Sequence, residues 1–393
     1  MRGLRIAMLT YSVRPRGGVV HAVEVAGALR ARGHHVELIA IGQPGARFFR
    51  PPRVPATIIE HRPPEAPFDD RVAAMIAAYA RGLRELAGRR SYDVVHAQDC
   101  VSAHAALALR DDGLIPDVLR TVHHVDAFTS PSLVACQHRS IVGPDAVVCV
   151  TQPWVERLRA EFGVEAGLVR NGVDAARYRP ARDAAERERA RAELGFGDRL
   201  VVLTVGGVEY RKGSVVLAEA FANLRRELAE RDPLLVVAGG ATLFDHRHEK
   251  ERFARRRHEL GLGDDAIRLV GSVSDERLEL LYRAADVFAF PSVVEGFGLV
   301  VLEALAADLP VVVSDIAVLA DVAVHERSAL VAPAGDARGF GRELVRAAGD
   351  RALRARLRSG GRAVVAGYGW ATAARAHERA YADLLARRAA VAA

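Results

Sequence analysis

Two glutamates, Glu295 and Glu303, lie eight residues apart around a glycine-rich turn. The apolar run 285–290 before them predicts a short buried strand, and the apolar spacing of 299–307 predicts a helix. A strand, a glycine-rich loop and a helix N-terminus offer free backbone N–H groups and a positive dipole end to an anion. Two carboxylates make sense there if they accept hydrogen bonds from hydroxyl groups flanking the anion, which is the layout of a nucleotide sugar.

Each glutamate taken alone also fits a simpler role. Glu295 stands before the predicted helix and fits a capping acid, and Glu303 fits a solvated helix face. The stretch as a whole favours a ligand site, because the strand, the glycines and both carboxylates occur together.

A basic pair forms the second candidate site. The predicted strand 200–205 is followed by a loop that contains Gly206 and ends at Arg211 and Lys212, before a predicted helix that Ser214 can cap. A guanidinium and an ammonium side by side at a strand-to-helix turn suit a diphosphate. The alternative is that both side chains are merely solvated, although Lys212 is one of only two lysines in the chain.

The N-terminal half opens as a βαβ unit. A predicted strand at 4–10 leads through a loop with Gly17 and Gly18 to a predicted helix at 19–32 and a strand at 35–40. This order predicts a doubly wound sheet, and the glycine pair lets a ligand approach the backbone at the sheet edge. The third glycine of a dinucleotide fingerprint is missing, and a plain turn is the alternative for this pair.

Histidines lie in or directly after two further predicted strands of this half. His123 and His124 come after the strand 118–122, at the sheet edge where open α/β sheets bind ligands. Either of them is a candidate for ligand contact, and the alternative is a loop histidine without a ligand. His96 lies inside the predicted strand 92–97 and fits a hydrogen-bonded structural role.

The stretch 291–306 resembles the signature of the family 4 retaining glycosyltransferases, which carry two glutamates around a Gly-Phe-Gly turn. Glu295, Phe297, Gly298 and Glu303 match it position by position. The resemblance extends over nearly the whole chain and is strongest from 205 to 313. Its other matches are the Gly17-Gly18 pair, Thr121-Val122-His123, Asn171-Gly172-Val173-Asp174 and Arg211-Lys212-Gly213.

The resemblance implies an α/β chain with the GT-B fold, in which two doubly wound Rossmann-like domains face across a cleft. It implies an acceptor-side domain at 1–175, a linker at 176–198 and a nucleotide-sugar-binding domain at 199–368. The remaining segment, 369–393, is expected to be a helix that crosses back to the N-terminal domain.

The implied reaction transfers a sugar from a nucleoside-diphosphate sugar, UDP- or GDP-linked, to an acceptor hydroxyl with retention at the anomeric carbon. His123 and Glu295 are the catalytic candidates: His123 would contact the sugar, and Glu295 would hold its hydroxyls. No tightly bound cofactor is expected, and no Asp-x-Asp motif suggests a metal. The donor-binding candidates are Gly18, Gly206, Arg211, Lys212, Gly296, Phe297, Gly298, Leu299 and Glu303.

Composition limits the other possibilities. Half of the 393 residues are hydrophobic and 26% are charged, which fits two globular domains. The net charge of +6 suits an anionic ligand and is too small to suggest nucleic acid. No apolar run is long enough to span a bilayer, no signal peptide precedes the first strand, and three unpaired cysteines suit a reducing cytosol. A cytoplasmic protein is expected, and arginines on the predicted helix 70–89 are compatible with peripheral contact at the inner membrane face.

The chain departs from the family pattern at several places. Asp308 stands where the family usually has glycine in left-handed geometry, and Asp315-Ile316-Ala317 replaces a Gly-Gly segment near the donor sugar. These changes leave the sugar open, and the sequence does not indicate the acceptor or the oligomeric state. Two rival functions are a nucleotide-sugar 2-epimerase of the same fold and a non-catalytic sugar-nucleotide-binding protein.

Overall fold

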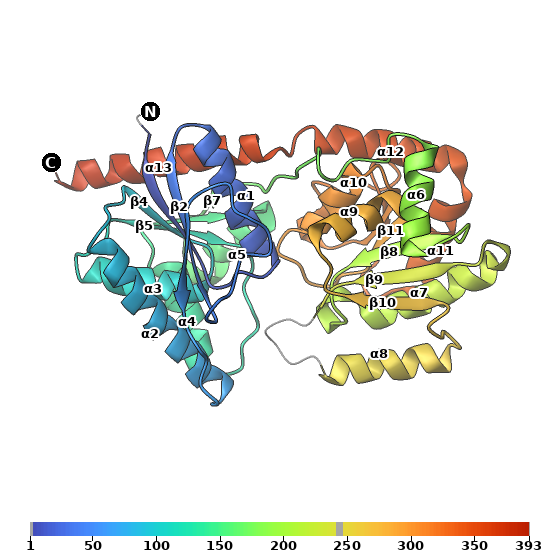
Figure 1. Cartoon of the computed structure of the whole chain (residues 1–393), viewed down its shortest axis with the longest axis horizontal. Coiled ribbons are helices and arrows are strands. Elements are labelled where there is room, and N and C mark those ends of the chain that lie inside the picture. The colour runs from blue at the N-terminus through green and yellow to red at the C-terminus, as the bar shows by residue number, and fades with distance from the viewer. Residues whose placement is uncertain (1–2, 241–246, 393) are drawn as a thin grey trace. The chain divides into compact units, whose positions relative to one another are not determined.

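The chain forms two compact α/β units in the computed structural model, which describes residues 3–240 and 247–392. One unit comprises Met1–Gly172 and Trp370–Ala393, and the other comprises Val173–Gly369. In each unit, helices cover both faces of a parallel sheet (Figure 1). The last helix of the chain therefore belongs with the N-terminal segment, and the segment 176–198 belongs to the second unit.

The first unit contains a seven-stranded sheet in the order β3-β2-β1-β4-β5-β6-β7. Chain order reverses between β1 and β4, so the loops after these strands flank the topological switch point where open α/β sheets bind ligands. The strands are β1 (Arg5–Thr10), β2 (His35–Gly42), β3 (Ala56–Glu60), β4 (Val94–Ala97), β5 (Val118–Val122), β6 (Ala146–Cys149) and β7 (Gly167–Leu168).

Helices on the two faces bury this sheet. One face packs against α1 and α13, and the opposite face packs against α2 and α3. Because both faces are covered, the central strands are mostly apolar on both sides, and the polar residues His96, Arg120 and Thr121 within them are buried. The helices are α1 (Gly17–Ala31), α2 (Phe68–Ala87), α3 (Cys100–Asp111), α4 (Pro131–Val142), α5 (Gln152–Phe162) and α13 (Trp370–Ala392).

The second unit contains a six-stranded parallel sheet in the order β10-β9-β8-β11-β12-β13, with its switch point between β8 and β11. The strands are β8 (Val201–Val205), β9 (Leu234–Ala238), β10 (Ile267–Gly271), β11 (Val287–Phe290), β12 (Val311–Ser314) and β13 (Leu330–Ala332). The helices are α6 (Ala184–Leu194), α7 (Ser214–Glu227), α8 (Arg247–Glu259), α9 (Asp275–Ala284), α10 (Leu299–Ala306), α11 (Ala337–Gly349) and α12 (Arg351–Val365). Three short 3-10 turns are η1 (Tyr210–Lys212), η2 (Ala229–Arg231) and η3 (Ala317–Leu319).

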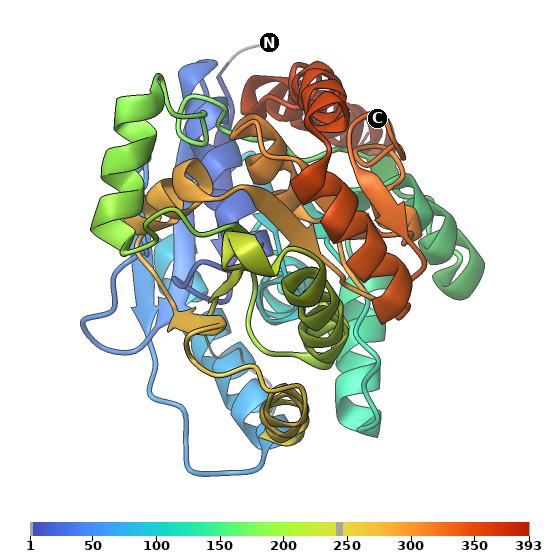
Figure 2. The same cartoon turned by 90° about the vertical axis from the view of Figure 1, so that its right-hand side faces the viewer.

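Two helix pairs cover the second sheet. α7 and α11 pack against each other on one face of the sheet (Figure 2). Phe221 and Phe340 of these helices are fully buried in the core. α9 and α10 contact β8, β11 and β12, and α6 and α12 pack onto these two helices. The turn after α10 has the left-handed geometry that the family resemblance implies, because Asp308 has a φ of 60°. Its carboxylate accepts a hydrogen bond from Arg362 at 2.7 Å.

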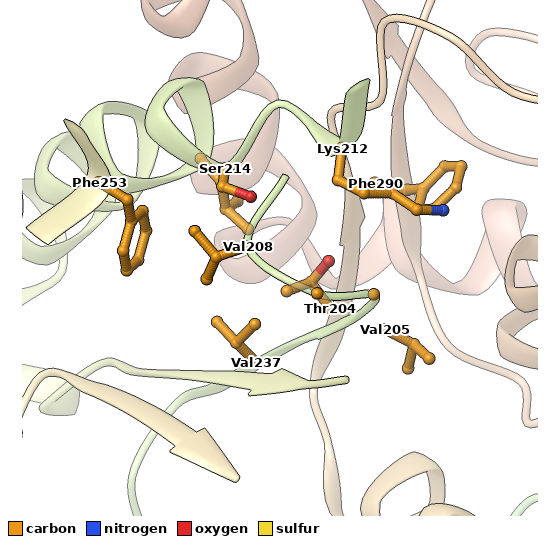
Figure 3. Close-up of a pocket in the computed structure, with 11 residues that line it drawn as sticks. Thr204, Val205, Val208, Lys212, Ser214, Val237, Phe253 and Phe290 are labelled. Atoms are coloured by element: carbon orange, nitrogen blue, oxygen red, sulfur yellow. The ribbon is translucent and has the colours of Figure 1, made fainter. Parts of the chain in front are cut away.

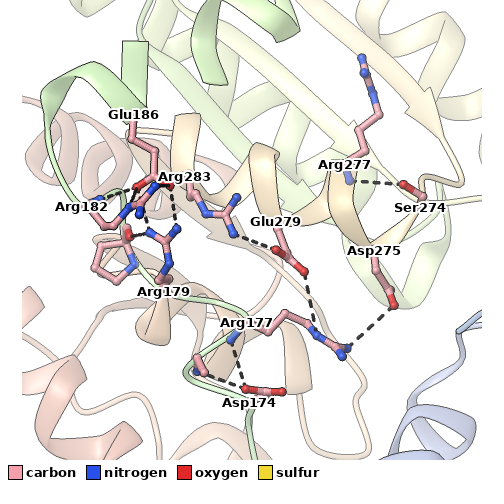
Figure 4. A network of polar contacts seen from close by, with 12 residues as sticks. Asp174, Arg177, Arg179, Arg182, Glu186, Ser274, Asp275, Arg277, Glu279 and Arg283 are labelled. Atoms are coloured by element: carbon pink, nitrogen blue, oxygen red, sulfur yellow. Dashed lines mark hydrogen bonds and ion pairs between the residues drawn. The ribbon is translucent and has the colours of Figure 1, made fainter. Parts of the chain in front are cut away.

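Ion pairs fasten the start of the second unit to α9 (Figure 4). The Arg177 guanidinium lies 3.8 Å from the Asp275 carboxylate and 4.0 Å from that of Glu279. Further along, Glu186 accepts hydrogen bonds from the Arg179 side chain and from the backbone N–H of Arg182. These bonds lower the pKa of Glu186 far below its usual range. The stretch between Asp174 and α6 is thus held against its own unit.

Candidate functional site

An ion pair marks the switch point of the second unit. Lys212, after β8, donates from Nζ to Oε1 of Glu295, after β11, at 2.5 Å. Ser292 donates to the same oxygen at 3.0 Å, and the ammonium lies 4.8 Å from the centroid of the Phe290 ring. Glu295 is 8% exposed, so its carboxylate is held by the protein at the carboxyl end of the sheet. Glu295 does not cap a helix, because α10 begins after Gly298 without a side-chain cap.

Arg211 lies between two carboxylates. Its Nε donates to Glu209 at 2.7 Å, and its Nη1 lies 3.7 Å from Oε1 of Glu295. Glu209 is itself buried. The prediction that Ser214 caps α7 is wrong: Gly213 occupies the N-cap position, and the Ser214 hydroxyl bonds the backbone N–H and C=O of Glu209 instead.

A small pocket opens beside this pair, between the ends of β8, β9 and β11 (Figure 3). Figure 3 shows the Lys212 side chain running along the Phe290 ring at one side of the pocket. The predicted Gly206 lies in its wall, and a Cβ there would meet Cδ of Lys212 at 3.2 Å. The lining residues are Thr204, Val205, Gly206, Gly207, Val208, Lys212, Ser214, Leu217, Val237, Phe253 and Phe290.

The glycine-rich turn leads directly into α10. Gly298 has a φ of 87°, and a Cβ there would approach Leu319 to 2.7 Å, so glycine is required on both counts. Leu299 is the first residue of α10, whose leading N–H groups have no acceptor within the helix. Phe297 is buried with its ring centroid 6.1 Å from that of Tyr368, and Gly296 completes the turn.

Glu303 is buried rather than solvated. It is 8% exposed, and the hydroxyl of Tyr282 in α9 donates to its Oε2 at 2.8 Å. Burial and the nearby Glu303 raise the pKa of Tyr282 well above its usual value, so this hydroxyl stays protonated. The alternative of a solvated helix face is therefore excluded, and Glu303 joins α10 to α9.

The first unit places two predicted residues in contact. Gly18, at the start of α1, approaches the His123 ring so closely that a Cβ would meet Cδ2 at 3.1 Å. Nε2 of His123 lies 3.1 Å from Oε1 of the buried Gln98, which follows β4. His124 is exposed and pairs with Asp126 at 3.3 Å. Of the two histidines, His123 is the one fixed at the switch point of this sheet.

Buried imidazoles surround His123. The ring centroid of His21 lies 4.9 Å from that of His123, and His377 of α13 lies 5.3 Å from both His21 and His96. Desolvation, followed by the neighbouring His21, holds the pKa of His123 well below its usual value. The structural role predicted for His96 is confirmed, because its two nitrogens bond Tyr381 and Thr121 at 2.8 Å each.

Several side chains that hold these sites were not predicted from the sequence. Ser292 and Glu209 fix the positions of Glu295 and Arg211, and Gln98 and His21 hold His123. Gln98 carries a recognisable signal, since it is a polar residue directly after a buried strand. Glu209 and His21 carry none, because their partners lie far along the chain or depend on the loop conformation.

Within the described ranges, 3–240 and 247–392, no group of three or more His, Cys, Asp or Glu side chains is arranged to hold a metal. At the switch point of the second unit, positive charge comes from the side chains of Arg211 and Lys212 and from the N-terminal end of α10. Of the described helices, none has the length and apolar character needed to cross a membrane.

We expect Lys212→Ala to weaken UDP and GDP binding by tenfold or more, because the variant loses the charge that faces a diphosphate. It should also cost roughly 2 kcal/mol of stability, because the buried Glu295 loses a charged hydrogen bond. Calorimetric titration and urea unfolding measure the two effects. The double variant Lys212→Met with Glu295→Gln removes both charges and should regain stability without regaining affinity; recovered affinity would contradict the assignment.

For Glu303→Gln we expect a KM for the donor about tenfold higher with little change in kcat, as for a ligand contact that is equal in ground and transition states. The amide oxygen can still accept from Tyr282, so the melting temperature should stay within a few degrees of wild type. Steady-state kinetics and thermal melts test this. Tyr282→Phe is the matched control, since it removes the same bond from the other side. If Glu303→Gln melts as early as Tyr282→Phe and keeps its KM, Glu303 is purely structural.

The two doubly wound parallel domains are those of the GT-B fold. A family model of glycosyl transferases group 1 matches residues 186–364, and one of glycosyltransferase family 4 matches residues 15–177. The chain is 30% identical to a D-inositol 3-phosphate glycosyltransferase of Xylanimonas cellulosilytica, over 98% of both chains. The chain therefore belongs to the family 4, group 1 glycosyltransferases.

Solved structures confirm the predicted fold. Sucrose-phosphate synthase from Thermosynechococcus elongatus matches with a TM-score of 0.81 at 23% identity, covering 98% of this chain and 100% of that one. Anabaena HepE in complex with UDP-glucose matches with a TM-score of 0.77 at 17% identity, over 98% and 100% of the two chains. The prediction of a glycosyltransferase is likewise confirmed by the family matches.

Proposed function

We propose that the protein is a retaining glycosyltransferase that moves a sugar from a UDP- or GDP-sugar to an acceptor hydroxyl. The bond between C1 and the diphosphate oxygen breaks, and a new C1–O bond forms on the same face of the sugar. The acceptor proton leaves with the diphosphate. In this proposal residues 199–368 bind the nucleotide sugar and residues 1–175 receive the acceptor.

The observation that carries the proposal is the Lys212–Glu295 pair at the switch point of the second unit. Every hydrogen bond and ion pair that the described residues make to this carboxylate falls on Oε1, so Oε2 can still accept from sugar hydroxyls. Lys212, Arg211 and the N–H groups of Gly298 and Leu299 would bind the diphosphate. Glu303 would bind the ribose, and His123 would contact the sugar.

A neutral imidazole suits that last role. If Nε2–H of His123 donates to Gln98, the lone pair of Nδ1 remains an acceptor for a sugar hydroxyl. The low pKa of His123 keeps the ring neutral at physiological pH. A cationic ring would be unsuitable beside a sugar carbon that gains positive charge as the diphosphate leaves.

The test is a thermal-shift screen of UDP and GDP sugars, followed by product analysis. A bound donor raises the melting temperature by mass action. Turnover is then measured with an acceptor panel that includes D-inositol 3-phosphate, because curated relatives carry that name. NMR of the product should show the anomeric configuration of the donor. Activity should persist in excess EDTA, and complete loss that magnesium or manganese restores would refute the metal-free mechanism.

The same assay separates the two rival functions. A 2-epimerase would convert the donor to its C2 epimer with no acceptor present. A non-catalytic binding protein would show a thermal shift without even slow hydrolysis of the donor. An inverted product configuration would refute retention but leave the transferase assignment intact.

We also infer a cytoplasmic protein whose contact with a membrane, if any, is electrostatic. The apolar side of α2 packs on α3, and its outward face carries Asp70, Ala73, Ala77, Arg81 and Arg84. That face has no apolar stripe to insert into lipid. Vesicle sedimentation at low and high salt tests it, since electrostatic binding is lost at high salt.

A further inference from the structure

The His21 ring lies near His123 and near the two places where the chain leaves the first unit and returns to it. His21 is fully buried in α1, with its ring edge-on to His123 at a centroid distance of 4.9 Å. Nδ1 lies 2.5 Å from Oδ1 of Asn171, and the Trp370 ring centroid lies 6.0 Å away. Asn171 is one residue before the point where the chain leaves this unit, and Trp370 is the residue at which it returns.

The hydrogen bond to Asn171 fixes both the orientation and the tautomer of this imidazole. The amide oxygen is an acceptor, so Nδ1 of His21 carries the proton. Nε2 then carries an unprotonated lone pair, and among the described residues it has no hydrogen-bond partner. Burial and the neighbouring His377 lower the pKa of His21 to about 3, so the ring stays neutral and keeps this arrangement.

We propose that His21 is a positioning residue that sets the place of the His123 ring. Gly18 packs against the His123 ring and Gln98 bonds its Nε2. The His21 ring packs against His123 at an interplanar angle of 75°, and His21 is itself held by Asn171 and packed near His377. In this arrangement His21 restricts the tilt of the His123 ring about its bond to Gln98. This inference rests on the proposed role of His123 as a sugar contact.

These contacts also connect His21 to the two segments by which the chain passes from one unit to the other. The Val173 N–H donates to the Tyr368 carbonyl at 2.7 Å, so the two crossing segments pair with each other within the second unit. Tyr368 also packs on Phe297 of the glutamate motif. These segments therefore contact Phe297 in the second unit and His21 in the first. The position of the His123 ring depends on the hydrogen bond between Asn171 and His21.

The test is a double-mutant cycle on His21 and His123. His21→Phe keeps an aromatic ring and removes the bond to Asn171. We expect it to lower kcat about tenfold for the fastest sugar of a UDP-glucose and GDP-mannose panel, with KM within twofold. In a His123→Ala background, His21→Phe should cause no further loss, because His21 acts only through His123. A full tenfold loss in that background would overturn the inference.

Two further measurements protect the test. Asn171→Ala removes the hydrogen bond to the His21 ring from the other side and should lower kcat by the same factor. This variant replaces His21→Phe as the test if His21→Phe fails to fold. Turnover at the wild-type rate in that variant would also overturn the inference. His34→Gln is the matched control: His34 is also buried and bonds Glu378 of α13 at 2.9 Å, far from His123 in the chain. It should lower the melting temperature and leave kcat within twofold.

An NMR readout is independent of turnover. In protein labelled with ¹⁵N-histidine, His21→Phe should change the imidazole shifts of His123, and His34→Gln should leave them unchanged. If the wild type turns over no sugar of the panel, the proposed function fails. The NMR shifts still show whether His21 sets the position of the His123 ring. Unchanged His123 shifts in His21→Phe would overturn the inference even in an active enzyme.

Discussion

Glu295→Gln should lower kcat by about a hundredfold or more, the loss expected when a substrate-positioning group is misplaced. In the native protein, Oε1 accepts from Lys212 and Ser292, and Oε2 remains for the sugar. Glutamine can keep the first two bonds through its amide oxygen. The amide nitrogen then takes the place of Oε2, so the site offers the sugar a donor where an acceptor is needed, and the negative charge is lost.

The fold should survive this change, because the oxygen that the protein uses is retained. Steady-state kinetics at saturating donor measure kcat, and a thermal melt confirms folding. Glu249→Gln is a matched control: Glu249 is also buried and pairs with Arg252 at 2.8 Å, but it lies on α8. It should keep kcat within twofold. Wild-type kcat in Glu295→Gln would show that the carboxylate serves only the ion pair.

The sequence was sufficient to predict the sheets and their loops. The strands are short apolar runs covered on both faces, and the helices between them have regular apolar spacing. The Gly298 turn was predictable because its geometry excludes other residues. The prediction passed over α3, α4 and β13. α3 and α4 carry Cys, Ser and His among their apolar positions, which blurs the helical period, and β13 has only three residues.

Long-range partners could not be predicted from the sequence. Glu303 was predicted to bind the ribose, with a solvated helix face as the alternative, and nothing in the sequence indicates that Tyr282 from another helix meets it. Ser214 fitted an N-cap by type, but the left-handed Gly213 takes that position and turns the hydroxyl toward Glu209. His21 and His377 are more than 350 residues apart and meet only because α13 packs on α1. Such contacts depend on how elements dock.

The buried histidines also predict that acid unfolds the first unit. The imidazoles of His21, His96 and His377 are fully buried. Desolvation, the largest cause, lowers the pKa of His21 to about 3 and that of His377 to about 4, and it holds the pKa of His96 well below its usual value. The charged or titratable groups that act on this cluster are its own imidazoles with His123, and around His123 also His124 and Arg120.

The direction of the effect follows from proton binding. An unfolded histidine titrates near pH 6.5. Between that pH and the lower folded values, the unfolded chain binds more protons, so the free energy of unfolding falls as pH falls. From pH 7.5 to pH 5.5 each buried ring should cost about 1.4 kcal/mol, or about 4 kcal/mol for the three. That is a large part of the stability of a typical domain.

Tryptophan fluorescence can follow this loss in one unit alone. The chain has two tryptophans, Trp154 and Trp370, and both belong to the first unit. Urea unfolding monitored by their emission should therefore give a free energy that falls between pH 7.5 and 5.5. His377→Leu removes one titrating ring and should reduce the slope by about one proton, whereas the exposed His35→Gln should leave it unchanged. A free energy that does not depend on pH in the wild type would show that these rings accept protons in the folded state.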